Sequence, residues 1–269
     1  MPADHYENFP VASFLLPAPL RRPVEVIYAF ARSADDFADE GDVPDAARLA
    51  SLERYDRELD AIEGGRKPSP GLFTDLSGVI AEHGLPIGLF HDLIDAFKQD
   101  VGKKRYADFA ELMDYCRRSA NPVGRLMLHL YRAVSEENLT RSDAICSSLQ
   151  LINHWQDIAI DWRKGRVYLP QEDLLRFEVD EAQIGDGRVD ARWTALMAFQ
   201  CRRALAMMQS GAPLGRALPG RIGLELRAIV AGGTRIADKI EAVRGDIFRH
   251  RPQLHALDWA RIALAAVLK

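Results

Sequence analysis

Apolar residues recur every three or four positions along nearly the whole chain, which is the spacing of amphipathic helices. The clearest stripe contains Val26, Phe30 and Phe37. It lies between Pro23, which suits a first helical position, and Gly41, which suits a helix end. No alternating strand pattern of useful length appears between such stripes. We therefore predict an all-α fold in which residues 1–269 form a single domain.

Further helices follow from the same spacing and from the residues that start and stop helices. Asp108 and Glu111 fit a capping box at the start of one of them. Asn121-Pro122 should interrupt that helix, because proline lacks the backbone N–H and clashes with the preceding turn. The other expected helical ranges are 52–62, 76–83, 87–97, 142–163, 191–209, 222–244 and 256–268, with longer connections at 178–190 and 211–220.

The composition fits a protein with a sizeable core, because 48% of the residues are hydrophobic. The formal net charge is −4, which argues against nucleic acid as a partner, since nucleic-acid surfaces carry a basic excess. Cys116, Cys146 and Cys201 are far apart, so neither a disulfide framework nor a zinc site is indicated. No secretory signal and no apolar run of ~20 residues is visible, so we expect a cytoplasmic protein.

Four acidic residues end the first predicted helix. Asp35 and Asp39 are four positions apart and so share one helix face, while Asp36 and Glu40 form a second pair on a neighbouring face. Like charges at this spacing repel, and at a helix C-terminus they also oppose the macrodipole. This segment alone is compatible with a solvated acidic helix end or with a site for a hard cation such as Mg²⁺.

A second acidic stripe favours the cation site. Asn153, Asp157 and Asp161 recur at intervals of four on the helix predicted over 142–163, and most of the other positions there are apolar. Such a helix belongs inside a bundle, and its carboxylates then need partners. We predict that the two stripes form the walls of a metal cluster. An internal ion-pair network without a ligand is the alternative.

Basic residues lie beside both stripes. Arg32 is one turn before Asp35, and Lys164 and Arg166 follow Asp161. Mg²⁺ together with Arg and Lys is the expected clamp for a diphosphate, which carries several negative charges. The segment therefore predicts a diphosphate site.

At these residues the chain resembles the squalene/phytoene synthase family. The resemblance rests on Tyr28 to Asp39, on Tyr115 to Gly124, and on the second stripe followed by Gly165 to Pro170. It implies the isoprenoid synthase fold, a helical bundle with a central active-site cavity. It also implies a prenyl diphosphate substrate that is ionised with the help of two or three Mg²⁺ ions.

The resemblance assigns roles residue by residue. It implies that metal ions are bound by Asp35, Asp39, Asp157 and Asp161, with Asn153 nearby. It implies that diphosphate is faced by Arg32, Lys164 and Arg166. The pocket is expected to contain Tyr28, Tyr115, Asn121, Val123, Gly124, His154 and Tyr168.

Within the family, the chain looks most like the hydroxysqualene synthases of bacterial hopanoid biosynthesis. This likeness rests on Tyr6 to Ser13, Ser119 to Arg125 and Asn153 to Asp157. Such enzymes ionise presqualene diphosphate and capture the rearranged cation with water, without NADPH. Condensing members usually carry Arg at the position of Gln156. They also commonly carry a tyrosine in a late helix, where this chain has Gly232-Gly233. These departures favour an enzyme for one diphosphate substrate.

Gln156 or His154 could position the capturing water, although a packed core histidine is the plainer interpretation of His154. The alternative function is head-to-head condensation of two farnesyl or geranylgeranyl diphosphates. An alternative of another class is a non-catalytic helical partner protein of the pathway. Because substrate and product are lipids, the resemblance leaves open peripheral contact with a membrane and contact with neighbouring pathway enzymes.

Overall fold

The computed structural model describes residues 16–268, and within them the secondary structure is helical apart from one isolated β-bridge. This confirms the predicted all-α class. The longer helices are α1 (Ala18–Asp39), α2 (Asp45–Glu63), α3 (Leu72–His83), α4 (Gly88–Gly102), α5 (Phe109–Ser119), α6 (Asn121–Leu130), α7 (Glu136–Arg163), α10 (Ala191–Gly211), α12 (Gly220–Ala242) and α13 (Ala256–Leu268). Short helices are α8 (Gln171–Arg176), α9 (Glu181–Gly185) and α11 (Leu214–Ala217).

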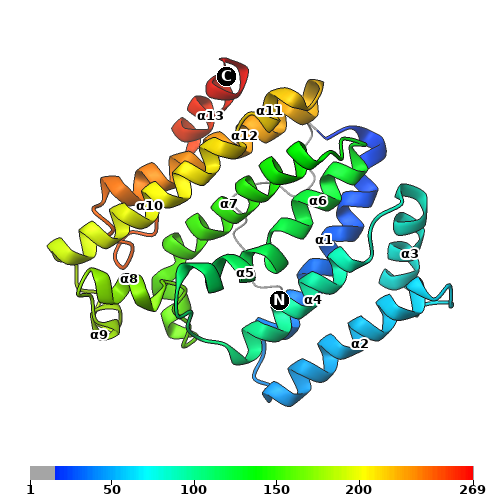
Figure 1. Ribbon diagram of the computed structural model, residues 1–269, viewed down its shortest axis with the longest axis horizontal. Helices are drawn as coiled ribbons and strands as arrows, with labels where there is room; N and C mark the ends of the chain where they lie inside the picture. The colour runs from blue at the N-terminus through cyan, green and yellow to red at the C-terminus, as the bar shows by residue number, and fades with distance from the viewer. Residues whose placement is uncertain (1–15, 269) are drawn as a thin grey trace.

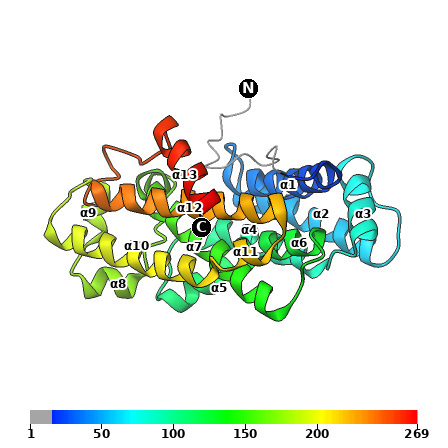
Figure 2. The ribbon, with the colours of Figure 1, turned by 90° about the horizontal axis from the view of Figure 1, so that it is seen from above.

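Helix α7 runs through the middle of the bundle, with α5 and α6 on one side and α10 and α12 on the other (Figure 1). Its start is fixed by Ser135, whose side chain accepts a hydrogen bond from the backbone N–H of Asn138. Buried residues lie on most of its faces, as expected for a helix inside a bundle. In Figure 2, α13 lies along one face of the molecule and α8 along the opposite face. None of the helices within 16–268 is long and apolar enough to cross a membrane.

The buried apolar residues form two clusters. One joins α1, α2, α3 and α4 with the inner face of α6, and the other surrounds α7 and includes α10 and α12. Large rings fill their centres, with Phe30 in the first and Trp155 and Trp193 in the second. An apolar cavity lies where the two clusters meet, so the division of the core positions the pocket described below.

Several predicted boundaries were wrong by one or two turns. Helix α1 begins at Ala18, so Pro19 occupies the first turn and Pro23 lies inside the helix, where it is buried. Pro23 removes one backbone hydrogen bond there, a loss offset by its contacts with the core. Helix α7 begins at Glu136 rather than near residue 142, because Ser135 caps it. The connections at 178–190 and 211–220 contain the short helices α9 and α11.

The start and end of α5 follow the predicted signals. The Asp108 side chain accepts a hydrogen bond of 2.8 Å from the Glu111 N–H, and Glu111 in turn accepts from the Ala107 N–H. Helix α5 ends at Ser119, and α6 restarts at Asn121, so the Asn-Pro pair breaks the helix as expected. The stretch Tyr6 to Ser13, used above for the likeness to hydroxysqualene synthases, lies outside the described residues.

Candidate active site

The two acidic stripes meet where α1 and α7 end. The Asp39 carboxylate forms an ion pair of 3.1 Å with Lys164 and another of 2.6 Å with Arg166. Both cations follow α7 directly, so the first stripe faces the end of the second across a short gap. This arrangement confirms that residues about 125 positions apart share one polar site.

The acidic end of α1 is also neutralised by neighbouring arginines. Arg32 forms ion pairs with Asp35 at 3.2 Å and with Asp36 at 2.7 Å. Arg48 in α2 donates hydrogen bonds to the carbonyls of Phe37, Glu40 and Gly41. Arg48 therefore caps the C-terminus of α1, where a cation interacts favourably with the helix dipole. No pattern in the sequence indicates this role of Arg48, because it depends on how α2 packs.

Burial and the neighbouring charges shift the pKa values of these carboxylates in different directions. Burial raises the pKa of Asp35 to about 6, with the neighbouring Asp39 charge as the second cause. Burial and then the Asp157 charge raise the pKa of Asp161 to about 8. Burial acts in the same direction on Asp39, but its bonds with Arg166 and Lys164 lower the pKa overall. Clustered carboxylates, two of them with raised pKa values, are a donor set that suits a hard divalent cation.

Asp157 is held by Arg251, which was not among the predicted site residues. The Arg251 guanidinium donates to both carboxylate oxygens of Asp157, at 2.6 and 3.2 Å. Arg251 lies between α12 and α13, in a segment without helical periodicity, 94 residues from Asp157. No local sequence signal could have linked the two, so this cation adds to the predicted set only through the tertiary structure.

Tyr115 and Tyr168 lie beneath the acidic site and bind a buried carboxylate that the prediction omitted. The Tyr115 and Tyr168 hydroxyls donate to Asp100 in α4 at 2.7 and 3.3 Å, and Arg166 donates to the Asp100 carbonyl at 3.1 Å. Burial raises the pKa of Asp100 to about 7. The Asp100 carbonyl in this cluster thus holds the Arg166 guanidinium in place. Asp100 was detectable, because it falls on the apolar stripe of α4.

Two other predicted pocket residues, Asn121 and His154, and the predicted catalytic residue Gln156 are engaged in internal contacts. Asn121 accepts a hydrogen bond of 2.8 Å from the buried Ser147 hydroxyl. Gln156 is buried and donates to the backbone carbonyl of Pro252. His154 is buried and stacks on the Tyr168 ring at a centroid distance of 3.7 Å. These contacts join each side chain to other parts of the protein. A role for Gln156 or His154 in positioning water stays a prediction.

His154 makes stability depend on pH. Burial, and then the nearby Arg166 charge, lower the pKa of His154 to about 3 from a usual value of 6.5. The unfolded chain therefore binds a proton that the folded protein excludes, and stability falls as the pH drops from 6.5 towards 3. This single group contributes a slope of up to about 1.4 kcal/mol per pH unit.

We expect His154→Gln to show a shallower loss of unfolding free energy between pH 6.5 and 4.5 than the wild type, by about that slope. Urea unfolding at several pH values measures it. The exposed His250 provides the control, since His250→Gln should keep the wild-type slope. Equal slopes in the wild type and His154→Gln would contradict the assignment.

An apolar cavity of about 340 Å³ lies between α1, α6, α7 and α12. Tyr28, Val123 and Gly124 line it, as predicted. Gly124 is required for the packing, because a Cβ there would overlap the side chains of Ser142 and Cys146 in α7. Ala31 also lines the cavity, one helical turn before Asp35. The cavity and the acidic site are therefore adjacent along α1.

One charged side chain lines this cavity among the described residues that do so, and it is Glu225 of α12. It lies close enough to Tyr131 for its charge to raise the pKa of that hydroxyl, although burial is the larger cause. Glu225 falls among apolar positions of α12 in the sequence, but the period alone did not show that this face lines a cavity.

The four predicted metal ligands do not form a preassembled triad. Among residues 16–268, the set of three side chains whose ligand atoms all lie within 4.8 Å of one another is Asp60, Glu63 and His91, on α2 and α4. The two stripes instead face each other across a gap, with Asp39 and Asp157 held by cations. Opposed walls of this kind suit ions that bridge a bound diphosphate rather than a closed protein cage.

Known proteins resemble this chain in sequence and in fold. Residues 3–258 match the squalene/phytoene synthase family. The hydroxysqualene synthase of Rhodopseudomonas palustris is 36% identical over 242 residues, which cover 87% of this chain and 80% of that protein. The 15-cis-phytoene synthase of Synechococcus elongatus is 30% identical over 264 residues, covering 93% and 84%.

Among solved structures, the squalene synthase HpnC of Alicyclobacillus acidocaldarius superposes with a TM-score of 0.83 at 36% identity. The match covers 89% of this chain and 90% of that one. These findings confirm the resemblance drawn from the two motifs and the isoprenoid synthase fold that it implied. The chain belongs to the squalene/phytoene synthase family of isoprenoid synthases.

Proposed function

We propose that the protein is a carbon–oxygen lyase that converts presqualene diphosphate and water into hydroxysqualene and diphosphate. One observation carries the proposal: the polar site at the ends of α1 and α7 adjoins an apolar cavity along α1. A diphosphate bound at the polar site would direct its prenyl chains into the cavity. The relatives named hydroxysqualene synthase support the specific reaction.

The reaction divides between the two regions. At the polar site the carbon–oxygen bond of the substrate breaks, and both electrons leave with the diphosphate. Arg32, Lys164 and Arg166 would hold the departing anion through charge-assisted hydrogen bonds. Mg²⁺ ions, bound by the carboxylates of the two acidic stripes, would offset further negative charge on the diphosphate.

The apolar cavity has the second task. Its aliphatic and aromatic wall keeps bulk water from the carbocation until rearrangement is complete. One water oxygen then forms the new carbon–oxygen bond and releases a proton. Hydride is not consumed in this sequence, so NADPH is not required.

Two features favour one diphosphate substrate over two. Gln156 donates to the Pro252 carbonyl, whereas condensing members of the family usually have Arg there. A Cβ on Gly233 would lie 2.7 Å from Leu149 Cδ2 and 2.9 Å from Met208 Cε. Aliphatic side chains thus fill the space beside Gly233, at the place where condensing members commonly have a tyrosine. Both observations reduce the polar groups available to a second diphosphate.

The deciding experiment is incubation with Mg²⁺ and presqualene diphosphate, without NADPH, followed by product identification. We expect diphosphate release and a C30 alcohol. A parallel incubation with farnesyl diphosphate alone should leave the substrate unconsumed. Conversion of farnesyl diphosphate into a cyclopropyl product would instead support the condensing function, which the similarity to phytoene synthases also favours.

A further inference from the structure

A second hollow lies on the outer side of α12. It has a volume of about 630 Å³ and is bounded by the end of α10, by α11, by α12 and by α13. Helix α12 separates it from the catalytic cavity: Leu226 and Ile229 line the inner cavity, whereas Val230 and Ala231 line this outer groove. The groove is therefore distinct from the candidate active site.

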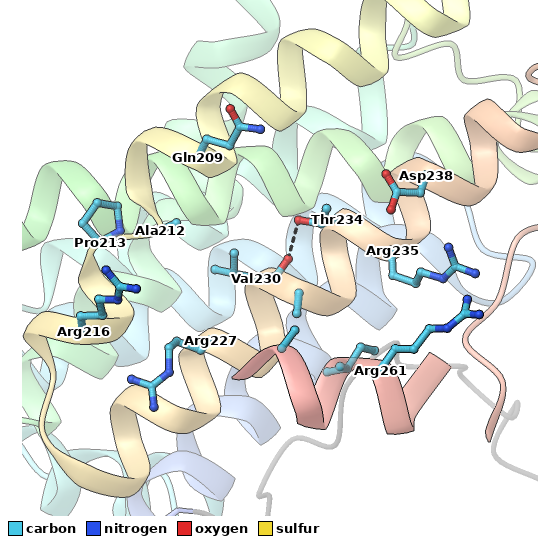
Figure 3. Close-up of a pocket in the computed structure, with 13 residues that line it drawn as sticks. Gln209, Ala212, Pro213, Arg216, Arg227, Val230, Thr234, Arg235, Asp238 and Arg261 are labelled. Atoms are coloured by element: carbon cyan, nitrogen blue, oxygen red, sulfur yellow. Dashed lines mark hydrogen bonds between the residues drawn. The ribbon is translucent and has the colours of Figure 1, made fainter. Parts of the chain in front are cut away.

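The groove carries a concentration of positive charge. Arg216, Arg227, Arg235 and Arg261 line it, and Asp238 is the acidic residue among its described lining side chains. Figure 3 shows Arg235 and Arg261 at one end of the groove and Arg216 and Arg227 at the other. The chain as a whole has a net charge of −4, so the positive charge of this groove is opposite in sign to the net charge of the protein. Such a patch attracts anions.

Helix α13 is held on α12 by ion pairs and hydrogen bonds. Its buried Asp258 pairs with Arg235 at 2.7 Å and with Lys239. These bonds lower the pKa of Asp258 although burial opposes the shift. At the far end, Arg227 donates to the Ala266 carbonyl at 2.6 Å. The outer face of α13 is thus held in a defined orientation.

That outer face is apolar. Leu257, Leu264 and Leu268 are 77%, 61% and 72% exposed, and at 100° per residue they share one stripe. Arg261 lies within the same stripe and also lines the groove. Five of the ten exposed large hydrophobic residues between 16 and 268 lie on α13: Leu257, Trp259, Leu264, Val267 and Leu268. An exposed stripe of leucines beside arginines is typical of a helix that lies in a membrane interface.

We propose that α13 and the arginine groove dock the protein on an anionic lipid bilayer, with the leucine stripe inserted among the acyl chains and the exposed Arg261 facing lipid phosphates. A second copy of the chain is a poorer occupant. A symmetric dimer would bring the same arginine patch against itself, and like charges would repel. Docking is independent of the proposed reaction, so it can be tested without turnover.

The test is vesicle flotation with the full chain. We expect binding to vesicles of phosphatidylglycerol and phosphatidylcholine, at least tenfold weaker binding to phosphatidylcholine alone, and weaker binding at 0.5 M NaCl than at 0.05 M NaCl. Arg261→Gln should weaken binding roughly 5-fold. Leu264→Gln with Leu268→Gln should weaken it at least about tenfold. Circular dichroism should show both variants folded, since all three side chains are exposed.

Matched controls come from the opposite face and from α2. Leu175 in α8 is 81% exposed, so Leu175→Gln makes the same change away from α13, and Arg54→Gln removes an exposed charge elsewhere. Both should bind as the wild type does. Binding that ignores lipid charge, or that falls equally in the controls, would overturn the proposal. So would a dimer in light scattering that the double Leu variant abolishes while vesicles remain unbound.

Discussion

Asp157→Asn and Asp161→Asn are each expected to lower kcat for diphosphate release by about 10²–10³-fold, the usual cost of removing one preorganised electrostatic contact at a reacting centre. Each change replaces a carboxylate ligand of the proposed Mg²⁺ ions by a neutral amide of nearly the same shape. Steady-state release of diphosphate from presqualene diphosphate measures the loss. Chelation of Mg²⁺ by EDTA should abolish release in the wild type, and added Mg²⁺ should restore it.

Both variants should fold, and the raised pKa of Asp161 provides a check for Asp161→Asn. The pKa of Asp161 is raised to about 8, so the folded protein loses stability as the pH rises from about 4 through 8, where the unfolded chain is already ionised. Without Mg²⁺ at pH 9, Asp161→Asn should therefore unfold at a higher temperature than the wild type. An inactive variant with raised thermal stability has lost ligands and not structure.

Asp75→Asn is the matched control, because Asp75 forms only an exposed ion pair with Arg22 on the described surface, and such pairs contribute little. It should keep wild-type turnover. If Asp157→Asn and Asp161→Asn also kept it, the metal site would be wrong, and the non-catalytic partner protein would become the better interpretation.

Local periodicity was sufficient for much of this site. The intervals of four in Asp35/Asp39 and in Asn153/Asp157/Asp161 fix which side chains share a helix face, whatever the tertiary structure. The apolar surroundings of the second stripe placed that helix inside the bundle. Together they predicted that two acidic walls face each other.

The arginines that contact these two acidic stripes from other parts of the chain could not be predicted in the same way. Arg48 reaches the end of α1 from α2, and Arg251 reaches Asp157 from a connection 94 residues away. Such contacts depend on how helices pack and have no period in the sequence. The tyrosines illustrate the same limit: Tyr28 lines the apolar cavity, whereas Tyr115 and Tyr168 bind Asp100. The resemblance placed all three in one pocket, but Tyr28 lies in α1, Tyr115 in α5 and Tyr168 in the connection between α7 and α8.

Arg166→Met is expected to destabilise the protein by about 3–5 kcal/mol, the typical cost of removing one partner of a buried ion pair. The Arg166 side chain is 8% exposed and joins Asp39 at 2.6 Å to the Asp100 carbonyl at 3.1 Å. Arg166 also lowers the pKa of Asp39, so its contribution is fully present at pH 7 and is lost as the pH falls through the folded pKa of Asp39. Urea unfolding at pH 7 measures the change.

A double-mutant cycle distinguishes lost charge pairing from lost packing. Asp39→Asn in the Arg166→Met background should recover part of the stability, because the carboxylate left without its buried partner is then neutral. Lys164→Met is the matched control: Lys164 contacts the same carboxylate at 3.1 Å, but its side chain is 39% exposed. Its removal should cost less than about 1 kcal/mol. Equal losses for the two cations would contradict the view that burial makes Arg166 the dominant partner of the first acidic stripe.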